Sequence, residues 1–118
     1  MKRNHRSLKA WQQAMELVEL VYNVAKTSPR EETFGLASQM RRSAISVPAN
    51  IAEGSARSGP RELLRFVSIA AASLSELDTY VEIAQRLGYM KAQSVVEKID
   101  SVSALLMGLG ASLKKKMA

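Results

Sequence analysis

The chain has 118 residues, of which 47% are hydrophobic, 24% are charged and only 5% are aromatic. This length predicts a single domain over residues 1–118. The absence of cysteine excludes disulfides, thiolate zinc sites and a cysteine nucleophile. An excess of 17 Lys and Arg over 11 Asp and Glu gives a net charge of +6, which permits an acidic partner such as nucleic acid without requiring one.

The first nine residues are basic, as in a signal peptide, but polar side chains follow where an apolar region would be needed. No window approaches the roughly 20 apolar residues of a membrane-spanning helix. We therefore expect a soluble, cytoplasmic protein with no secretory signal and no membrane partner.

The first predicted helix has apolar residues in steps of three and four, which is typical of one buried helical face. That seam consists of Leu8, Trp11, Met15, Val18, Tyr22 and Ala25. After it, Ser28, Pro29 and Glu31 supply a capping hydroxyl, a proline suited to the first helical position and a capping-box carboxylate. These three residues predict that a second helix starts near Pro29.

The second helix is predicted to end near Gly54, with a seam of Leu36, Met40, Ala44, Val47 and Ile51. Pro48 lies inside this pattern and cannot donate a hydrogen bond to the carbonyl of Ala44, which predicts a kink. Asn50 is then expected to bond a freed backbone group or the facing helix.

A third helix is predicted after Ser58, Gly59 and Pro60, ending at Gly88, and a fourth ends at the lysines 114–116, which suit a helix C-terminus. The third seam consists of Leu63, Val67, Ala70, Leu74, Leu77, Val81 and Ala84. The fourth seam consists of Val95, Ile99, Val102, Leu106, Leu109 and Leu113. With no strand signal, these segments predict an all-α fold, an antiparallel up-down-up-down four-helix bundle with the second helix kinked near Pro48.

A polar stripe flanks the second seam, and helical geometry places its members within an arc of about 80°. On the third helix, Glu76 is expected to face this stripe, so that Arg42 meets Glu76 or Glu53 in a charge-assisted network. One explanation of this stripe is structural: salt bridges and hydrogen bonds would fix the register of the helices within a subunit or between subunits. The alternative is that the stripe forms a ligand or nucleic-acid site. The network comprises Gln39, Arg42, Ser46, Asn50, Glu53 and Glu76.

A surplus of apolar and small residues on the second and third helices lies where a solvated face would carry Lys and Glu. A monomeric bundle would expose this surplus as a patch, which favours a subunit interface over an ordinary alanine-rich surface. The predicted interface residues are Ile45, Ala49, Ala52, Phe66 and Ile69.

Catalytic and metal-binding motifs are missing from the sequence. There is no glycine-rich phosphate loop, no helical histidine pair and no Glu-x-x-His element, and the lone His5 lies in the basic leader. Glu53 and Glu76 are expected to have arginine neighbours, which lower rather than raise the pKa of a carboxyl group. We therefore expect no enzyme activity, no metal and no cofactor.

The second helix carries the run Ser46-Val47-Pro48-Ala49-Asn50-Ile51-Ala52-Glu53-Gly54, after Gly35, Leu36, Gln39, Arg41, Arg42, Ser43 and Ala44. Together with Phe34 and Arg57, this run resembles the signature of the four-helix bundle family encoded in intervening sequences of bacterial 23S ribosomal RNA genes. The match continues through Trp11, Ala14, Tyr22, Phe66, Ile69, Ala70, Ser73, Glu76, Leu77 and Leu87-Gly88-Tyr89. The resemblance thus covers nearly the whole chain.

The resemblance implies an antiparallel bundle that assembles as a ring-like homopentamer without catalytic activity. The family is also similar to accessory proteins of diversity-generating retroelements, which bind nucleic acid and a reverse transcriptase. A reverse transcriptase or another protein is accordingly a possible partner beside RNA or DNA and further copies of the chain.

Two functions follow as alternatives. The first is an oligomeric nucleic-acid-binding protein that contacts the RNA backbone without reading sequence, because aromatic residues for base stacking are scarce. The second is a protein-protein interaction scaffold whose positive charge is incidental. For the first function, the predicted nucleic-acid-binding residues are Lys2, Arg3, Arg6, Lys9, Arg41, Arg57, Arg61 and Arg65.

Overall fold

The computed structural model describes residues 1–118 and consists of helices and their connections, without a strand. Four long helices account for most of the chain, which confirms the predicted all-α class. They are α1 (Lys9–Ala25), α2 (Leu36–Ala56), α3 (Gly59–Arg86) and α4 (Gln93–Met117), with short 3₁₀-helices η1 (Asn4–Ser7) and η2 (Arg30–Glu32) before α1 and α2.

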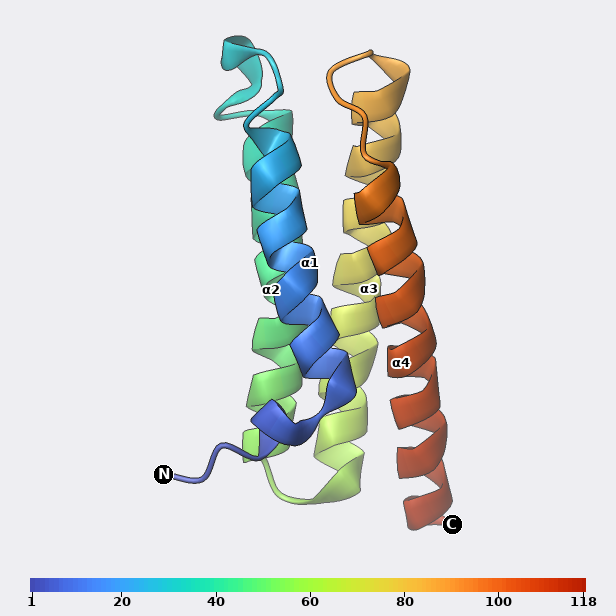
Figure 1. The fold of residues 1–118 in the computed structure, drawn as a ribbon. Coiled ribbons are helices and arrows are strands. Elements are labelled where there is room, and N and C mark those ends of the chain that lie inside the picture. The colour runs from blue at the N-terminus through green and yellow to red at the C-terminus, as the bar shows by residue number, and fades with distance from the viewer.

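The four helices lie side by side in a molecule that measures 47 × 27 × 19 Å. α1 contacts α2 and α4, and α3 likewise contacts α2 and α4, so that each helix has two neighbours around a shared core. Figure 1 shows the α1–α2 and α3–α4 connections at one end of the molecule. The α2–α3 connection and both chain termini lie at the other end (Figure 1).

The core contains the predicted seams of the second, third and fourth helices, with Leu36, Leu63 and Leu109 packed at its edge. The seam predicted for the first helix is only partly correct: Ala25 is buried and Leu8, Trp11 and Val18 pack at the edge of the core. Its members Met15 and Tyr22 are wrong, because both are 39% exposed. The first helix has two neighbouring apolar stripes, and the one with smaller side chains faces the core. The buried residues of α1 are Ala10, Ala14, Leu17, Val21 and Ala25.

The start of α2 also differs from the prediction. Pro29 precedes only the three-residue η2, and α2 begins at Leu36. The Ser28 hydroxyl donates to the carbonyl of Ala25 at 2.6 Å and so terminates α1 instead of capping α2. The carboxylate of Glu32 accepts a hydrogen bond from the Leu36 amide at 3.3 Å, which satisfies one of the free amides of the first turn.

α2 continues as one helix through Pro48 to Ala56, two residues beyond the predicted end, and the kink stays a prediction. The side-chain amide of Asn50 donates to the carbonyl of Ser46 at 2.8 Å and to the Ser46 hydroxyl at 2.9 Å. It makes no hydrogen bond to the Ala44 carbonyl, which Pro48 leaves without its donor, or to the facing helix. Asn50 therefore reaches α3 only indirectly, through Ser46.

Candidate nucleic-acid interface

Basic residues from three separate parts of the sequence lie at one end of the bundle. There the N-terminal leader, the α2–α3 connection and the end of α4 come together (Figure 1). This end, which we call the basic end, carries ten of the 17 cationic side chains but only Glu53 and Glu62 of the 11 carboxylates. Its formal side-chain charge is +8 and that of the remainder is −2. The cations are Lys2, Arg3, Arg6, Lys9, Arg57, Arg61, Arg65, Lys114, Lys115 and Lys116.

Trp11 anchors the leader against the first turn of α1. The His5 ring packs edge-on against the Trp11 ring with 5.1 Å between centroids, and the Arg6 guanidinium lies 5.9 Å from the same ring. The side-chain amide of Gln12 donates to the carbonyl of Arg6 at 2.8 Å. The leader thereby lies beside the end of α2: η1 contacts α2, and Lys2 lines a pocket together with Glu53 and Arg57.

Phe66 positions two further arginines. The guanidinium of Arg65 lies 5.0 Å and that of Arg57 lies 5.4 Å from the ring centroid, distances at which a cation is attracted to an aromatic face. Arg57 also pairs with Glu53 at 3.1 Å across an exposed helix turn. Phe66 itself is only 6% exposed, so the expectation that a single chain would expose its ring is wrong, and its place in a subunit interface stays a prediction. The ring packs at the α2–α3 junction beneath the two cations.

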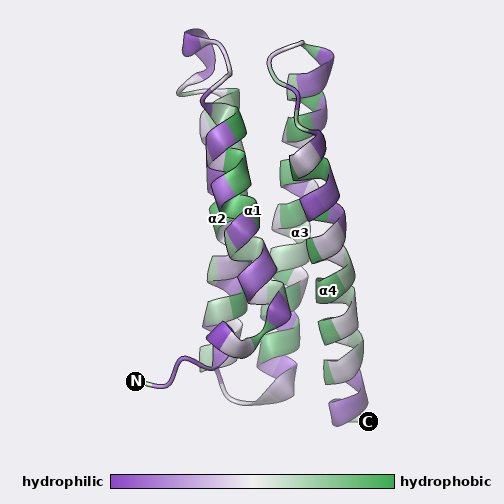
Figure 2. Cartoon of the chain, viewed as in Figure 1, coloured by the Kyte–Doolittle hydropathy of each residue, from purple (hydrophilic) through white to green (hydrophobic).

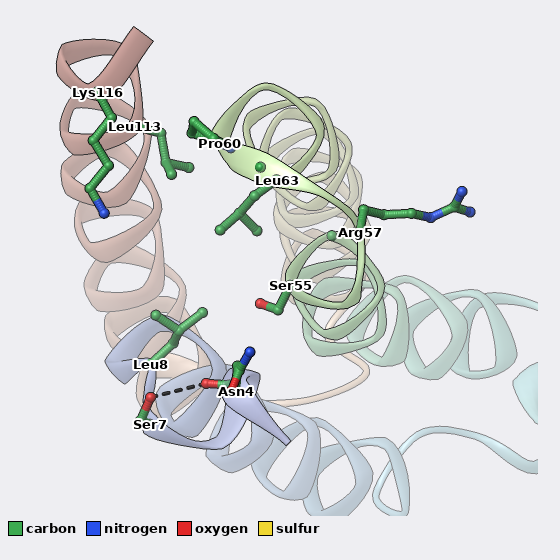
Figure 3. A pocket seen from close by; sticks show the side chains of 11 residues that line it. Asn4, Ser7, Leu8, Ser55, Arg57, Pro60, Leu63, Leu113 and Lys116 are labelled. Atoms are coloured by element: carbon green, nitrogen blue, oxygen red, sulfur yellow. Dashed lines mark hydrogen bonds between the residues drawn. The ribbon is translucent and has the colours of Figure 1, made fainter. Parts of the chain in front are cut away.

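An open pocket of about 370 Å³ lies at the basic end, between the leader, the α2–α3 connection and the last turns of α4. Figure 3 shows Leu8, Leu63 and Leu113 as its apolar walls, with Lys116 across the opening and the Arg57 side chain directed away. The Ser55 hydroxyl oxygen is buried and has no hydrogen-bond partner. The pocket thus joins apolar walls, one unsatisfied hydroxyl and nearby positive charge.

The structure does not bring Arg41 to the basic end. Its guanidinium donates to the carbonyl of Thr33 at 3.0 Å and lies 5.9 Å from the Tyr22 ring centroid, beside the α1–α2 connection. Conversely, sequence reasoning missed Lys114, Lys115 and Lys116 as members of the interface. The even number of predicted helices was a signal that could have found them. When successive helices of a bundle run in opposite directions, the C-terminus of the fourth helix lies at the same end as the N-terminus of the first.

The predicted polar network forms only in part. The hydroxyls of Ser46 and Ser73 are 2.8 Å apart and link α2 to α3, with Asn50 bonded to Ser46. Burial and then the nearby Glu76 carboxylate raise the pKa of the Tyr80 phenol, whereas Arg42 lowers it. Arg42 makes no ion pair with Glu76 or Glu53, and Glu53 pairs instead with Arg57, the residue that follows α2. Gln39 contributes only its backbone carbonyl, which accepts the Ser43 hydroxyl at 3.0 Å.

The other predicted interface residues lie at the surface of the single chain. Ile45 is 43% and Ile69 38% exposed, Ala49 is exposed and Ala52 is half-buried. These exposures leave an apolar surface over α2 and α3, and its role as an oligomer contact stays a prediction.

Replacing Ser73 with alanine is expected to lower the free energy of unfolding by about 1 kcal/mol, because it removes the partner of the half-buried Ser46 hydroxyl. Urea denaturation measures this change. Thr79→Ala is a matched control, since the exposed Thr79 hydroxyl bonds only the Ser75 carbonyl of its own helix. Equal effects of the two substitutions would contradict a stabilising link between α2 and α3.

Comparisons with known proteins identify relatives in sequence and in structure. The model of the 23S rRNA-intervening sequence protein family matches residues 6–108. The chain is similar to the 1.70 Å crystal structure of a protein of unknown function from the S23 ribosomal protein family of Bacteroides thetaiotaomicron. The TM-score is 0.63 at 20% identity, over 88% of this chain and 94% of the other. No curated protein matches. In addition, none of the four helices has the length and apolar character needed to span a membrane.

Proposed function

Because the chain belongs to the 23S rRNA-intervening sequence protein family, we propose that it is a non-enzymatic, cytoplasmic protein that binds RNA through its phosphate backbone. The basic end is the contact surface in this proposal. The observation that supports it is the convergence of three basic segments into a region of formal charge +8 on a chain of net charge +6. Phosphate contacts by Lys and Arg supply most of the affinity of sequence-independent binding.

The proposal specifies backbone contact rather than base reading. Aromatic side chains are scarce, and the two at the basic end, Trp11 and Phe66, already have arginine side chains stacked on them. Sequence-tolerant base stacking requires open aromatic faces. Arg57, Arg61 and Arg65 together with the leader and the terminal lysines are therefore proposed to contact phosphates.

Assembly as a ring-like homopentamer is part of the proposal, with Ile45, Ala49, Ala52 and Ile69 at the subunit contact. Five copies would carry about +30 before counter-ions, which would strengthen binding to phosphates. Sedimentation tests this assembly. A stable monomer at micromolar concentration would contradict it.

A protein-protein scaffold is the second candidate. The observation that favours it is the apolar surface left by α1, where Met15 and Tyr22 are each 39% exposed beside the half-buried Trp11 and Val18. In this alternative the charge is incidental and the partner is another protein.

The dependence of RNA binding on salt separates the two candidates. If about five cations of the basic end contact phosphates of a short RNA duplex, log K against log[salt] should have a slope of about −4.5. Fluorescence anisotropy measures binding between 50 and 300 mM salt, with an unrelated protein of equal net charge as the control. Affinity at moderate salt that is no higher than that of the control would overturn the RNA proposal.

A further inference from the structure

The second half of α4 has no charged residue from position 101 to 113. Only Val102, Leu106, Gly110 and Leu113 of this stretch are buried within the bundle. Figure 2 shows the stretch as hydrophobic or neutral up to the hydrophilic tip at the C-terminus. Met107 is 73% exposed at its centre. A helix surface that faces only water normally carries charged residues, so this face has the composition of a contact surface.

A groove of about 550 Å³ runs beside this face, between α3 and α4. Leu64, Val67 and Leu106 provide apolar lining, and Met107 stands at the rim. Gly110 leaves room in the groove, because a Cβ atom built there would have only the Leu64 Cδ1 atom within 4 Å, at 3.8 Å. The groove can therefore accept a long apolar side chain.

Opposite charges lie at the two ends of the groove. Lys114 lines one end. A neighbouring pocket shares Ala71 and Ser103 with the groove and continues it to Asp78 and Asp100. Asp100 and Lys114 are each seven residues from Met107, which places each of them within about 20° of Met107 around α4 and all three on one face. A rotation of 180° about an axis through Met107, perpendicular to α4, therefore exchanges the positions of Asp100 and Lys114.

We propose that the occupant of this groove is a second copy of the same chain, with the two α4 helices antiparallel about a two-fold axis at Met107. In that arrangement the Met107 side chain of each copy enters the groove of the other. Asp100 of each copy faces Lys114 of the other, so the attraction is made twice. Such a contact is isologous, whereas the contacts that close a ring are heterologous. It also uses the α3–α4 groove and not the surface over Ile45 and Ile69, so it goes beyond the proposed function.

A single cysteine tests the two-fold geometry directly, since the chain contains no other cysteine. Only a two-fold contact brings position 107 of one copy against position 107 of the other, within the Cα separation of roughly 4.4–6.8 Å that a disulfide requires. Under mild oxidation, Met107→Cys is expected to form a disulfide-linked dimer at least tenfold faster than Ser112→Cys. Ser112 is the matched control because it is exposed on the same helix but lies off this face. Equal rates for the two variants would overturn the proposal.

Charge reversal in the Met107→Cys background tests the ends of the contact. Asp100→Lys and Lys114→Asp are each expected to slow dimer formation about tenfold, because each sets like charges opposite one another twice. The double variant should recover most of the original rate. A double variant as slow as the single variants would overturn the antiparallel register. The assay contains no RNA, so its failure would leave the proposed RNA binding unaffected.

Discussion

Replacing Arg57, Arg61 and Arg65 together with alanine is expected to weaken RNA binding on the order of 100-fold at physiological salt. Each lost phosphate contact removes the release of about one counter-ion, worth roughly fivefold in affinity at 0.15 M salt. The salt slope should become less steep by about 2.7. Anisotropy titrations of the variant and the unchanged protein over the same salt range measure both quantities.

The matched control is the triple substitution of Lys26, Arg30 and Lys91 with alanine. These residues are exposed, make no ion pair and lie at the end of the bundle opposite the basic end, so the net charge falls equally. We expect this control variant to lose at most severalfold in RNA affinity, because it weakens only the long-range electrostatic attraction of the whole protein. Equal losses for the two triple variants would show that binding follows net charge and not the basic end. Thermal unfolding of both variants checks that the loss of the Phe66 stacking has not unfolded the chain.

The helical seams show how far periodicity predicts this fold. On α3 and α4 the residues of the predicted seams are buried, except that Leu63 and Leu109 are only partly buried at the edge of the core. On α1 two stripes compete, and the sequence pattern favours the larger side chains of Trp11 and Tyr22. The structure buries Ala10, Ala14 and Val21 instead, because small side chains allow closer helix packing and the choice depends on the neighbouring helices.

The basic end shows what local sequence reasoning can and cannot provide. Each basic segment is evident in the sequence, but their convergence depends on how the helices are arranged. Arg41 lies on α2, as the other family-like residues of that helix do, yet its side chain bonds Thr33 beside the α1–α2 connection. Lys114–Lys116 look like ordinary helix-terminal lysines until the bundle brings them beside the leader. Hydrogen-bond partners on different helices, such as Ser46 and Ser73, likewise depend on the axial register between α2 and α3, which the sequence pattern of one helix does not specify.

Replacing Gly54 with alanine is expected to destabilise the protein by about 2 kcal/mol. Gly54 is buried where α2 packs directly against α3 at the basic end. A Cβ atom there would lie 2.6 Å from the Phe66 Cβ atom and 3.3 Å from the Leu63 Cα atom. Both atoms belong to or adjoin the α3 backbone, so relief requires the helices to separate. This cost outweighs the gain of up to about 1 kcal/mol that alanine normally brings to a helix interior. Urea denaturation measures the change.

Gly108→Ala is the control, because a Cβ atom at that helical position would meet no atom within 4 Å. It should gain up to about 1 kcal/mol of stability, so the two glycine substitutions should differ in sign. If Gly54→Ala also stabilises the protein, the close α2–α3 contact is not required. The same contact sets the position of Phe66, on which Arg57 and Arg65 stack. Under conditions where the Gly54→Ala variant remains folded, it should therefore also bind RNA more weakly. Because the substitution removes no charge, such a loss would link the packing of α2 against α3 to the proposed interface.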